Sequence, residues 1–253
     1  MSGAVYDFAR EAQRRALAGL EELPDGSHRC RDCKTVCDVS RFVGCPTCVL
    51  ERRARQELEE AREHLAADWD RVLAPAPSWS WSRFSNEGWR SRCDPRAIEA
   101  AERWDPRGSQ GLLMVGPTGV GKTSAIVAAL HATRDRDLEA LDSGRRPRAL
   151  RLLWTTEAQL VAARRNHALG RGEAPLIRKA TGAPLLIVDE LGFAPGGPTI
   201  AMEILDARYS KGRPTALTAG LARAAIVEAY GAAFYRRAAT GAVVVDLYAK
   251  ERS

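Results

Sequence analysis

The sequence predicts an α/β fold, in which helices flank a five-stranded parallel sheet and a small cysteine-rich helical module comes first. Three observations support this prediction. A glycine-rich turn at residues 116–123 lies between a short apolar segment and an alanine-rich segment with helical spacing. Four more apolar segments of strand length follow, and helical patterns separate them, which indicates a parallel sheet. Two Cys-x-x-Cys pairs lie within residues 30–48.

The composition favours a soluble protein with an anionic partner. Hydrophobic residues make up 45% of the 253 residues and charged residues 28%, which suffices for a core. The formal net charge of +6 favours nucleic acid over a merely solvated basic surface. No apolar run approaches the roughly 18 residues that span a membrane, and residues 5–23 carry too many charges for a signal peptide. We therefore expect a cytoplasmic protein without a membrane partner, whose cysteines are metal ligands or buried thiols.

Two helices are predicted in the N-terminal part. Residues 4–23 carry apolar side chains on one helical face, and residues 24–27 break this helix. Residues 49–73 predict a long solvated helix with one apolar stripe, suited to packing on the first helix or on a partner. The segment 74–78 is rich in alanine and proline and is expected to be a linker. We therefore place the domain boundary there, with an N-terminal partner-binding module at residues 1–78 and a second domain at 79–253.

The cysteine-rich segment predicts a zinc site. Cys30 and Cys33 form one Cys-x-x-Cys pair, and Cys45 and Cys48 form a second after eleven residues. Four thiolates spaced in this way can converge on a tetrahedral Zn²⁺. A segment this short has few other apolar residues for a core and needs such a cross-link. Cys37 or His28 could replace one ligand, but the symmetry of the pairs favours Cys30, Cys33, Cys45 and Cys48.

The glycine-rich turn has the pattern G-x-x-x-x-G-K-[ST] between a strand and a helix, which is the P-loop pattern. Its glycines allow backbone N–H groups to surround an anion at a helix N-terminus. Lys122 can reach the β- and γ-phosphates of ATP, and the Thr123 hydroxyl can bind Mg²⁺. The residues expected to bind the nucleotide are Gly116, Pro117, Thr118, Gly119, Val120, Gly121, Lys122, Thr123 and Ser124.

The other elements follow from apolar patterns. The predicted strands are 111–115, 149–154, 184–190, 214–218 and 242–246. The predicted helices of the second domain are 95–104, a P-loop helix from 124, a helix to 165 capped by Thr155 or Thr156, 174–180, 199–210 and 222–229. The charged stretch 134–148 is expected to be a loop. The aromatic residues Trp79, Trp81, Phe84 and Trp89 are more typical of a core edge than of base stacking.

Asp189 and Glu190 end the apolar strand 184–190. Open α/β sheets bind ligands at the carboxyl ends of their strands. Downstream of a P-loop, Asp189 is expected to help bind Mg²⁺, and Glu190 to polarise the attacking water. The simpler alternative is that both acids only begin a helix or loop.

These motifs resemble the DnaC/DnaI-type helicase loaders of the DnaC/IstB-like AAA+ ATPase family. The matching segments are 111–123, 185–192, 218–221 and 230–244, within roughly residues 80–247. The resemblance implies an AAA+ domain that hydrolyses ATP and acts on DNA. It also implies that the cysteine-rich module contacts a DnaB-type replicative helicase. The alternatives are an IstB-like transposition helper and a non-hydrolysing, ATP-gated binding module.

The resemblance also implies an arginine finger, and the sequence departs from the family pattern at one position. Family members carry a water-positioning asparagine where this chain has Gly220, and Thr218 partly serves that role. Arg237 matches the finger, with Arg236 as its substitute, and a finger acts on a neighbouring subunit. The resemblance therefore implies a homo-oligomeric ring or spiral. Arg164 and Arg165 match the region where such loaders contact single-stranded DNA, and the alternative is that both are merely solvated.

Overall fold

The structure is a computed structural model, and it describes residues 20–25, 27–37, 45–76, 80–168, 170–192 and 194–248. The chain divides into two compact units, residues 1–64 and 65–253. The helix α2, Pro46–Leu73, begins in the first unit and ends in the second. None of the helices in the described ranges combines the length and the apolar character that crossing a bilayer requires.

The first unit contains a small antiparallel sheet. Its strands are β1 (Leu20–Glu22), β2 (His28–Cys30) and β3 (Val36–Cys37), in the order β1-β2-β3. Its core consists of Leu20 and the side chains of five cysteines. The predicted helix 4–23 is wrong at its end, because Leu20 pairs with Cys30 across the sheet and is buried in this core. Residues 4–19 of that helix lie outside the described residues.

The second unit is built on a five-stranded sheet in the order β5-β6-β7-β4-β8, and all neighbouring strands run parallel. The predicted five-stranded parallel sheet flanked by helices is therefore confirmed. The strands are β4 (Gly111–Val115), β5 (Leu152–Thr156), β6 (Leu185–Leu191), β7 (Thr215–Ala219) and β8 (Ala242–Asp246). The strands β4, β6 and β7 are buried on both faces, which explains why they are continuously apolar.

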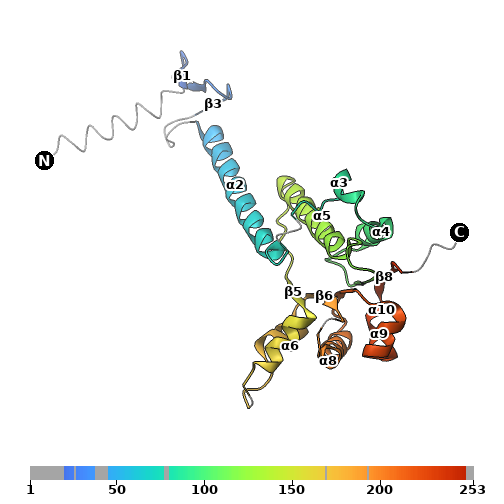
Figure 1. Cartoon of the computed structure of the whole chain (residues 1–253). Helices are drawn as coiled ribbons and strands as arrows, with labels where there is room; N and C mark the ends of the chain where they lie inside the picture. Colours follow the sequence, from blue (N-terminus) through green and yellow to red (C-terminus); the bar gives the residue numbers. More distant parts are fainter. Residues whose placement is uncertain are drawn as a thin grey trace. The chain divides into compact units, whose positions relative to one another are not determined.

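Helices cover both faces of this sheet. Figure 1 shows α4 and α5 on one side of the sheet and α6, α8, α9 and α10 on the other. The helices of the second unit are α3 (Glu87–Arg90), α4 (Pro95–Arg103), α5 (Lys122–Asp142), α6 (Glu157–Arg165), α7 (Pro175–Gly182), α8 (Gly197–Tyr209), α9 (Arg223–Tyr230) and α10 (Ala232–Ala239). Alternate residues of the central strands, such as Leu113 and Leu186, pack in one core with α6 to α10.

Further segments differ from the sequence prediction. The strand β5 begins at Leu152 and ends at Thr156, whereas it was expected at 149–154. Residues 134–142, expected in a loop, form the last turns of α5. Within this charged segment two side chains, Asp137 and Leu141, are buried. The Trp69 indole Nε1–H donates to Asp137 Oδ2 at 2.9 Å. The helix α10, which carries Arg236 and Arg237, was not predicted as a helix because Gly231 interrupts the pattern after α9.

Candidate functional site

Three loops meet at the carboxyl edge of the parallel sheet. The P-loop follows β4, Asp189 and Glu190 lie near the end of β6, and Gly220 follows β7. Because β7 lies between β4 and β6, its end faces both the P-loop and the acidic pair. The residues predicted from separate motifs are therefore brought to one place, as the ligand-binding rule for open α/β sheets requires.

The P-loop packs tightly against its surroundings. Gly121 has a φ of 94°, and an added Cβ there would lie 2.5 Å from the Cys93 Sγ. At Gly116 a Cβ would lie 2.6 Å from the Leu247 Cβ. Neither position can accept a side chain without rearrangement, and Gly121 also has a backbone conformation that favours glycine. The sequence pattern therefore reflects a physical requirement of this turn.

The Lys122 ammonium group lies inside the P-loop. Its Nζ donates to the carbonyl oxygens of Gly116 at 2.8 Å and of Pro117 at 2.6 Å. Burial lowers the pKa of Lys122, and the nearby negative charge of Asp189 opposes this shift. A buried cation whose hydrogen bonds go only to neutral carbonyl groups can gain much by contact with an anion. This arrangement fits a phosphate group within the loop.

Thr123 and Asp189 provide a pair of oxygen ligands that fits a magnesium ion. The Thr123 hydroxyl donates to Asp189 Oδ1 at 2.9 Å, and Asp189 is buried. Mg²⁺ prefers such hard oxygen atoms, usually one or two from the protein together with phosphate and water. The two side chains predicted to bind Mg²⁺ are therefore adjacent.

Thr218 holds the acidic pair in place. Its hydroxyl donates to Asp189 Oδ1 and accepts a hydrogen bond from the Glu190 backbone N–H at 3.0 Å. Thr218 is only 1% exposed, so both contacts lie in the protein interior. The sequence suggested that Thr218 partly replaces a water-positioning residue. In the structure its hydroxyl instead bridges Asp189 to the backbone of Glu190.

Glu190 lies in a β-bulge. Val188 pairs with Leu217 and Leu191 with Ala219, so two residues of β6 face one residue of β7. Glu190 has a φ of 61°, which is rare for a residue with a side chain. A bulge of this kind redirects a side chain, and the Glu190 side chain is exposed towards the cavity described next.

A cavity of about 650 Å³ joins these elements. This volume falls within the range of about 300–1,000 Å³ that is usual for small-molecule sites. The residues that line it are Trp81, Arg92, Cys93, Thr118, Gly119, Gly121, Lys122, Thr123, Ser124, Glu190, Thr218 and Gly220. The P-loop, the acidic pair and the end of β7 thus share one cavity.

The segment before α4 also lines this cavity, through Trp81, Arg92 and Cys93. The Arg92 guanidinium lies 6.0 Å from the centre of the exposed Trp81 ring. Trp89 is fully buried, and its Nε1–H donates to the Ser124 Oγ at 3.1 Å. The expectation of a core edge fits Trp89, whereas Trp81 lines the nucleotide-sized cavity. Trp81 and Arg92 are eleven positions apart, so no local sequence pattern indicated that they line one cavity.

A buried carboxylate links the loop after Glu190 to α9. Glu157 is 1% exposed and accepts hydrogen bonds from the Gly192 N–H at 2.9 Å and from the Tyr230 hydroxyl at 2.6 Å. Burial and the Glu157 carboxylate together raise the pKa of Tyr230, so this hydroxyl stays a donor. The sequence placed Glu157 only in the first turn of a helix, and its spacing gave no sign of these long-range contacts.

Arg237, on helix α10, lies at the end of the sheet opposite the P-loop. It lines a cavity of about 140 Å³ together with Gly111, Thr215 and Ala242, which begin β4, β7 and β8. This is the amino edge of the sheet, opposite the nucleotide-sized cavity. The Arg237 Nε lies 2.6 Å from Asp206 Oδ1, whereas Arg236 is exposed on the surface of α10. The geometry therefore separates Arg237 from its own P-loop.

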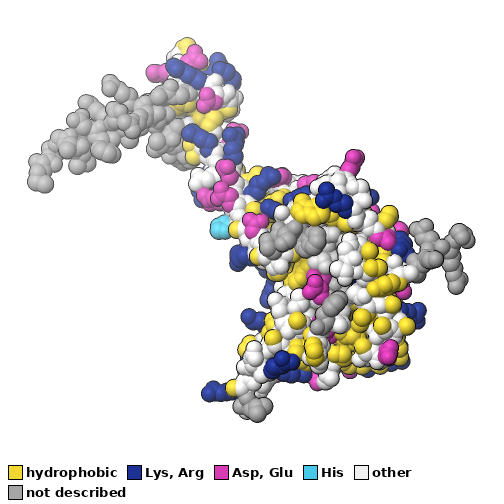
Figure 2. Space-filling view, in the orientation of Figure 1, with side chains coloured by type: hydrophobic (Ala, Val, Ile, Leu, Met, Phe, Trp, Pro, Cys, Tyr) yellow, Lys and Arg dark blue, Asp and Glu magenta, His cyan; other side chains and the backbone are white. Residues whose placement is uncertain are grey.

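The arginines expected to contact DNA differ from each other. Arg164 forms ion pairs with Glu173 at 2.5 Å and Glu203 at 2.6 Å, so its charge is compensated within the chain. Arg165 is exposed at the end of α6. Figure 2 shows basic and acidic side chains interspersed over the visible face, without one large basic area. The positive net charge is therefore not concentrated on this face.

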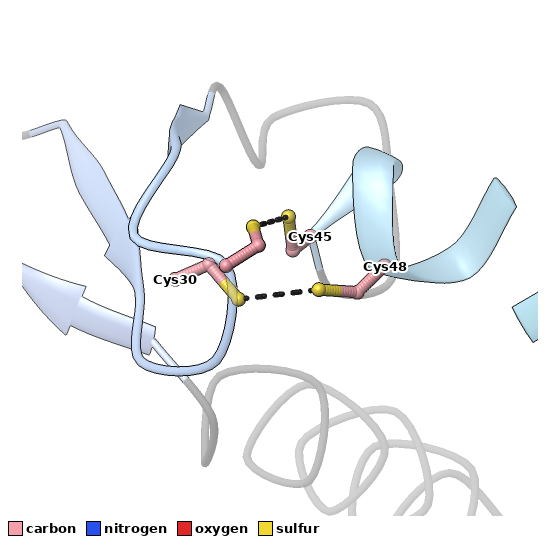
Figure 3. Close-up of side chains that lie close together, drawn as sticks. Cys30, Cys45 and Cys48 are labelled. Carbon is pink, nitrogen blue, oxygen red and sulfur yellow. Dashed lines mark hydrogen bonds between the residues drawn. The ribbon is translucent and has the colours of Figure 1, made fainter. Parts of the chain in front are cut away.

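The four predicted zinc ligands lie together in the first unit. Figure 3 shows the sulfur atoms of Cys30, Cys45 and Cys48 close together, between the β2 region and the start of α2. The Cys30 and Cys48 sulfurs are 3.5 Å apart, those of Cys33 and Cys45 are 3.6 Å apart, and all four lie within 4.8 Å of one another. Zn–S bonds of about 2.3 Å in a tetrahedron place sulfur atoms about 3.8 Å apart, so the cluster fits zinc.

The alternative ligands lie outside this cluster. The Cys37 Sγ donates to the His28 carbonyl oxygen at 3.5 Å, and burial raises the pKa of Cys37. Hydrogen bonds from Thr35 lower the pKa of Cys33 to about 6, whereas hydrogen bonds with Cys30 and Cys33 raise the pKa of Cys48. The geometry thus supports the symmetric set of four that the sequence favoured.

No protein-family model matches this sequence, and no curated protein matches it. Among solved structures, this one is similar to a crystal structure of the DnaC helicase loader, with 18% identity and a TM-score of 0.44 over 68% of this chain and 100% of that chain. It is similar to a crystal structure of DnaI, with 18% identity and a TM-score of 0.45 over 67% of this chain and 87% of that one. A putative primosome component from Streptococcus pyogenes serotype M3 is similar at 20% identity, with a TM-score of 0.43 over 68% and 93% of the two chains. The DnaC/DnaI loaders that the sequence resembles are thus also structural neighbours of this chain.

Proposed function

We propose that this chain is a magnesium-dependent ATPase that acts on DNA as a helicase loader of the DnaC/DnaI type. The observation that carries the ATPase assignment is the convergence of Lys122, the Thr123–Asp189 pair and Glu190 on one cavity. Two separate sequence motifs supply these groups, and a parallel sheet brings them to one edge. This is the arrangement that phosphoryl transfer to water needs.

Each side chain has a distinct role in this proposal. Lys122 binds the β- and γ-phosphates, and Thr123 and Asp189 hold Mg²⁺, which would neutralise charge on the phosphates. Glu190 accepts a proton from the attacking water as a general base. Thr218 positions Asp189 and the Glu190 backbone through its two hydrogen bonds.

Nucleotide binding is tested with Lys122→Ala. We expect this variant to lose most of its affinity for ATP, because the loop loses its cation. Lys179→Ala is a matched control, since Lys179 is exposed on α7. Equal ATP affinities of wild type and Lys122→Ala would contradict the assignment. Glu190→Gln should bind ATP as the wild type does and lose turnover.

Assembly is the second part of the proposal. Arg237 lies at the amino edge of the sheet, where it can serve only the nucleotide of another subunit. Its ion pair with Asp206 orients the guanidinium, and Arg236 on the same helix is the alternative finger. We therefore infer a homo-oligomeric ring or spiral in which one subunit completes the site of the next.

Mixing two inactive variants tests this arrangement. In a mixed assembly, an Arg237→Ala subunit keeps its own Glu190, and a Glu190→Gln neighbour supplies Arg237. Turnover should therefore return when the two variants are combined, although neither is active alone. If the mixture stays inactive while Arg236→Ala and Glu190→Gln complement each other, the finger is Arg236. A rate that is unaffected by either arginine would show a self-contained monomeric ATPase.

Single-stranded DNA and a DnaB-type helicase are the proposed partners. Exposed Arg165 can contact phosphate, and such contacts release counterions, so DNA stimulation of the ATPase should fade as salt rises. The cysteine module is proposed to contact the helicase. Cys45→Ser should then abolish co-purification with a replicative helicase and leave ATP binding intact, because the two sites lie in different units.

Two alternatives remain as outcomes of these tests. A transposition helper would bind a transposase instead of a helicase in the same co-purification assay. A non-hydrolysing, ATP-gated module would bind ATP through Lys122 without turnover. The absence of a side chain at Gly220, on the wall of the cavity, is the observation that favours this second alternative.

A further inference from the structure

At the end of β7, the wall of the cavity has no polar side chain that is free of other hydrogen bonds. Gly220 lines the cavity and has no side chain, and the neighbouring Thr218 hydroxyl is engaged with Asp189 and the Glu190 backbone. A water molecule that loses a proton to Glu190 needs a second hydrogen-bond partner to fix its orientation. Arg92, Thr118 and Ser124 also line the cavity, but a polar group beside Gly220 would follow β7, the strand next to the one that carries Glu190.

Tyr248 provides such a group. Its hydroxyl donates to the Gly220 carbonyl oxygen at 2.6 Å, although the two residues are 28 positions apart in the sequence. A phenol that donates its proton to a carbonyl still has lone pairs that can accept a hydrogen bond from water. The Tyr248 hydroxyl therefore lies one hydrogen bond from the wall of the nucleotide-sized cavity, beside the position that lacks a side chain.

The backbone before Tyr248 is fixed against the P-loop strand. After β8 ends at Asp246, the Leu247 N–H donates to the Val115 carbonyl oxygen at 2.8 Å, and the Tyr248 N–H donates to Asp246 Oδ1 at 2.9 Å. The Leu247 side chain is buried beside Gly116, where it would meet an added Cβ at 2.6 Å. Tyr248 is thus placed by the same contacts that shape the start of the P-loop.

A second set of contacts holds this turn from the side of α4. Arg96 donates to the carbonyl oxygens of Asp246 at 3.3 Å and of Leu247 at 3.1 Å. Arg96 also forms an ion pair with Asp94 at 2.7 Å, and the Asp94 N–H donates to the Val120 carbonyl oxygen at 3.0 Å. The Arg96–Asp94 ion pair therefore contacts both the turn that carries Tyr248 and the P-loop.

We propose that Tyr248 is a positioning residue for ATP hydrolysis, whose hydroxyl fills the role of the polar side chain that Gly220 lacks. This inference rests on the proposed ATPase function. The hydroxyl orients the attacking water and, through the Gly220 carbonyl group, fixes the backbone at the end of β7. Because Tyr248 is 42% exposed, its ring contributes little to the core, and loss of the hydroxyl alone should leave the fold intact.

The test is Tyr248→Phe in the full chain, with kcat, ATP affinity and melting temperature measured together. We expect kcat to fall by at least about 10-fold, as loss of one oriented hydrogen-bonding group at a reacting centre usually causes. ATP affinity and melting temperature should stay at the wild-type values. Ser143→Ala is the matched control, because the Ser143 hydroxyl also donates to a single carbonyl oxygen, that of Glu139 at 2.9 Å, but Ser143 lines neither of the two cavities.

A second substitution separates positioning from a structural role. Gly220→Asn places an amide group at the cavity wall and should restore turnover in the Tyr248→Phe background. Unchanged kcat in Tyr248→Phe would overturn the proposal. So would parallel losses of kcat, affinity and melting temperature without rescue, which would identify a structural contact. If wild type binds ATP through Lys122 but never turns it over, hydrolysis and the Tyr248 role both fail while ATP binding stands.

Discussion

Thr218→Val should destabilise the second unit, because it removes one hydroxyl from two hydrogen bonds while keeping shape and β-branching. A hydrogen bond to a carboxylate contributes about 1.5–3 kcal/mol, and the bond from the Glu190 N–H about 1 kcal/mol more. The expected loss is therefore about 3 kcal/mol, which corresponds to about 6–12 °C in melting temperature for a domain of this size. Buried Asp189 keeps Thr123 as a partner, so the unit should still fold.

The assay combines thermal unfolding with ATP binding at saturating Mg²⁺ and in the presence of a chelator. Thr218→Val should weaken ATP binding with Mg²⁺ much more than without it, since Thr218 acts through the metal-binding carboxylate. Thr218→Ser keeps the hydroxyl and should stay close to wild type in metal-dependent binding. Thr133→Val is a control for a buried threonine whose hydroxyl donates within helix α5. The reasoning is refuted if the Ser and Val variants of Thr218 behave alike.

Three further predictions concern other buried groups. Burial lowers the pKa of His131 from 6.5 to about 4, so the unfolded chain takes up a proton at a higher pH than the folded chain does. The free energy of unfolding should therefore fall as the pH drops from 6.5 to 4. His131→Leu should flatten this pH dependence, measured by urea titrations at several pH values. Metal analysis should find one zinc per chain in wild type and Cys37→Ser, and none in Cys45→Ser; zinc retained in Cys45→Ser would contradict the four-cysteine site. Arg208 is fully buried and donates to Thr215 Oγ1 and three carbonyl oxygens. Arg208→Lys should lower the free energy of unfolding in urea by at least about 2 kcal/mol, because one ammonium group cannot reach all four acceptors.

The central strands were predictable because burial on two faces leaves a strong sequence signal. The strand Leu185–Leu191 was expected at 184–190, and the strand Gly111–Val115 was expected with the same bounds. The edge strand Leu152–Thr156 is only partly buried and was expected earlier, at 149–154. The P-loop was predictable because its glycines are required by close packing. The end of α5 was missed because residues 134–142 are mostly charged, and only Asp137 and Leu141 are buried.

Contacts between distant residues could not be read from the sequence. The role of Glu157 depends on Gly192 and Tyr230, and the contact of Tyr248 depends on Gly220. Each of these residues looks ordinary in its own segment, because hydrogen bonds between separate elements follow no sequence period. The cysteine cluster is the exception, since its paired spacing fixes which atoms can meet.

Selection for stability alone would act against Glu190. Its left-handed backbone costs on the order of 1–3 kcal/mol for a residue with a side chain, whereas glycine adopts this conformation without strain. A library screened only for resistance to heat should therefore accumulate glycine or asparagine at position 190, and the survivors would bind ATP without turning it over. Selection for heat resistance thus favours glycine or asparagine at position 190, whereas selection for ATP turnover favours glutamate.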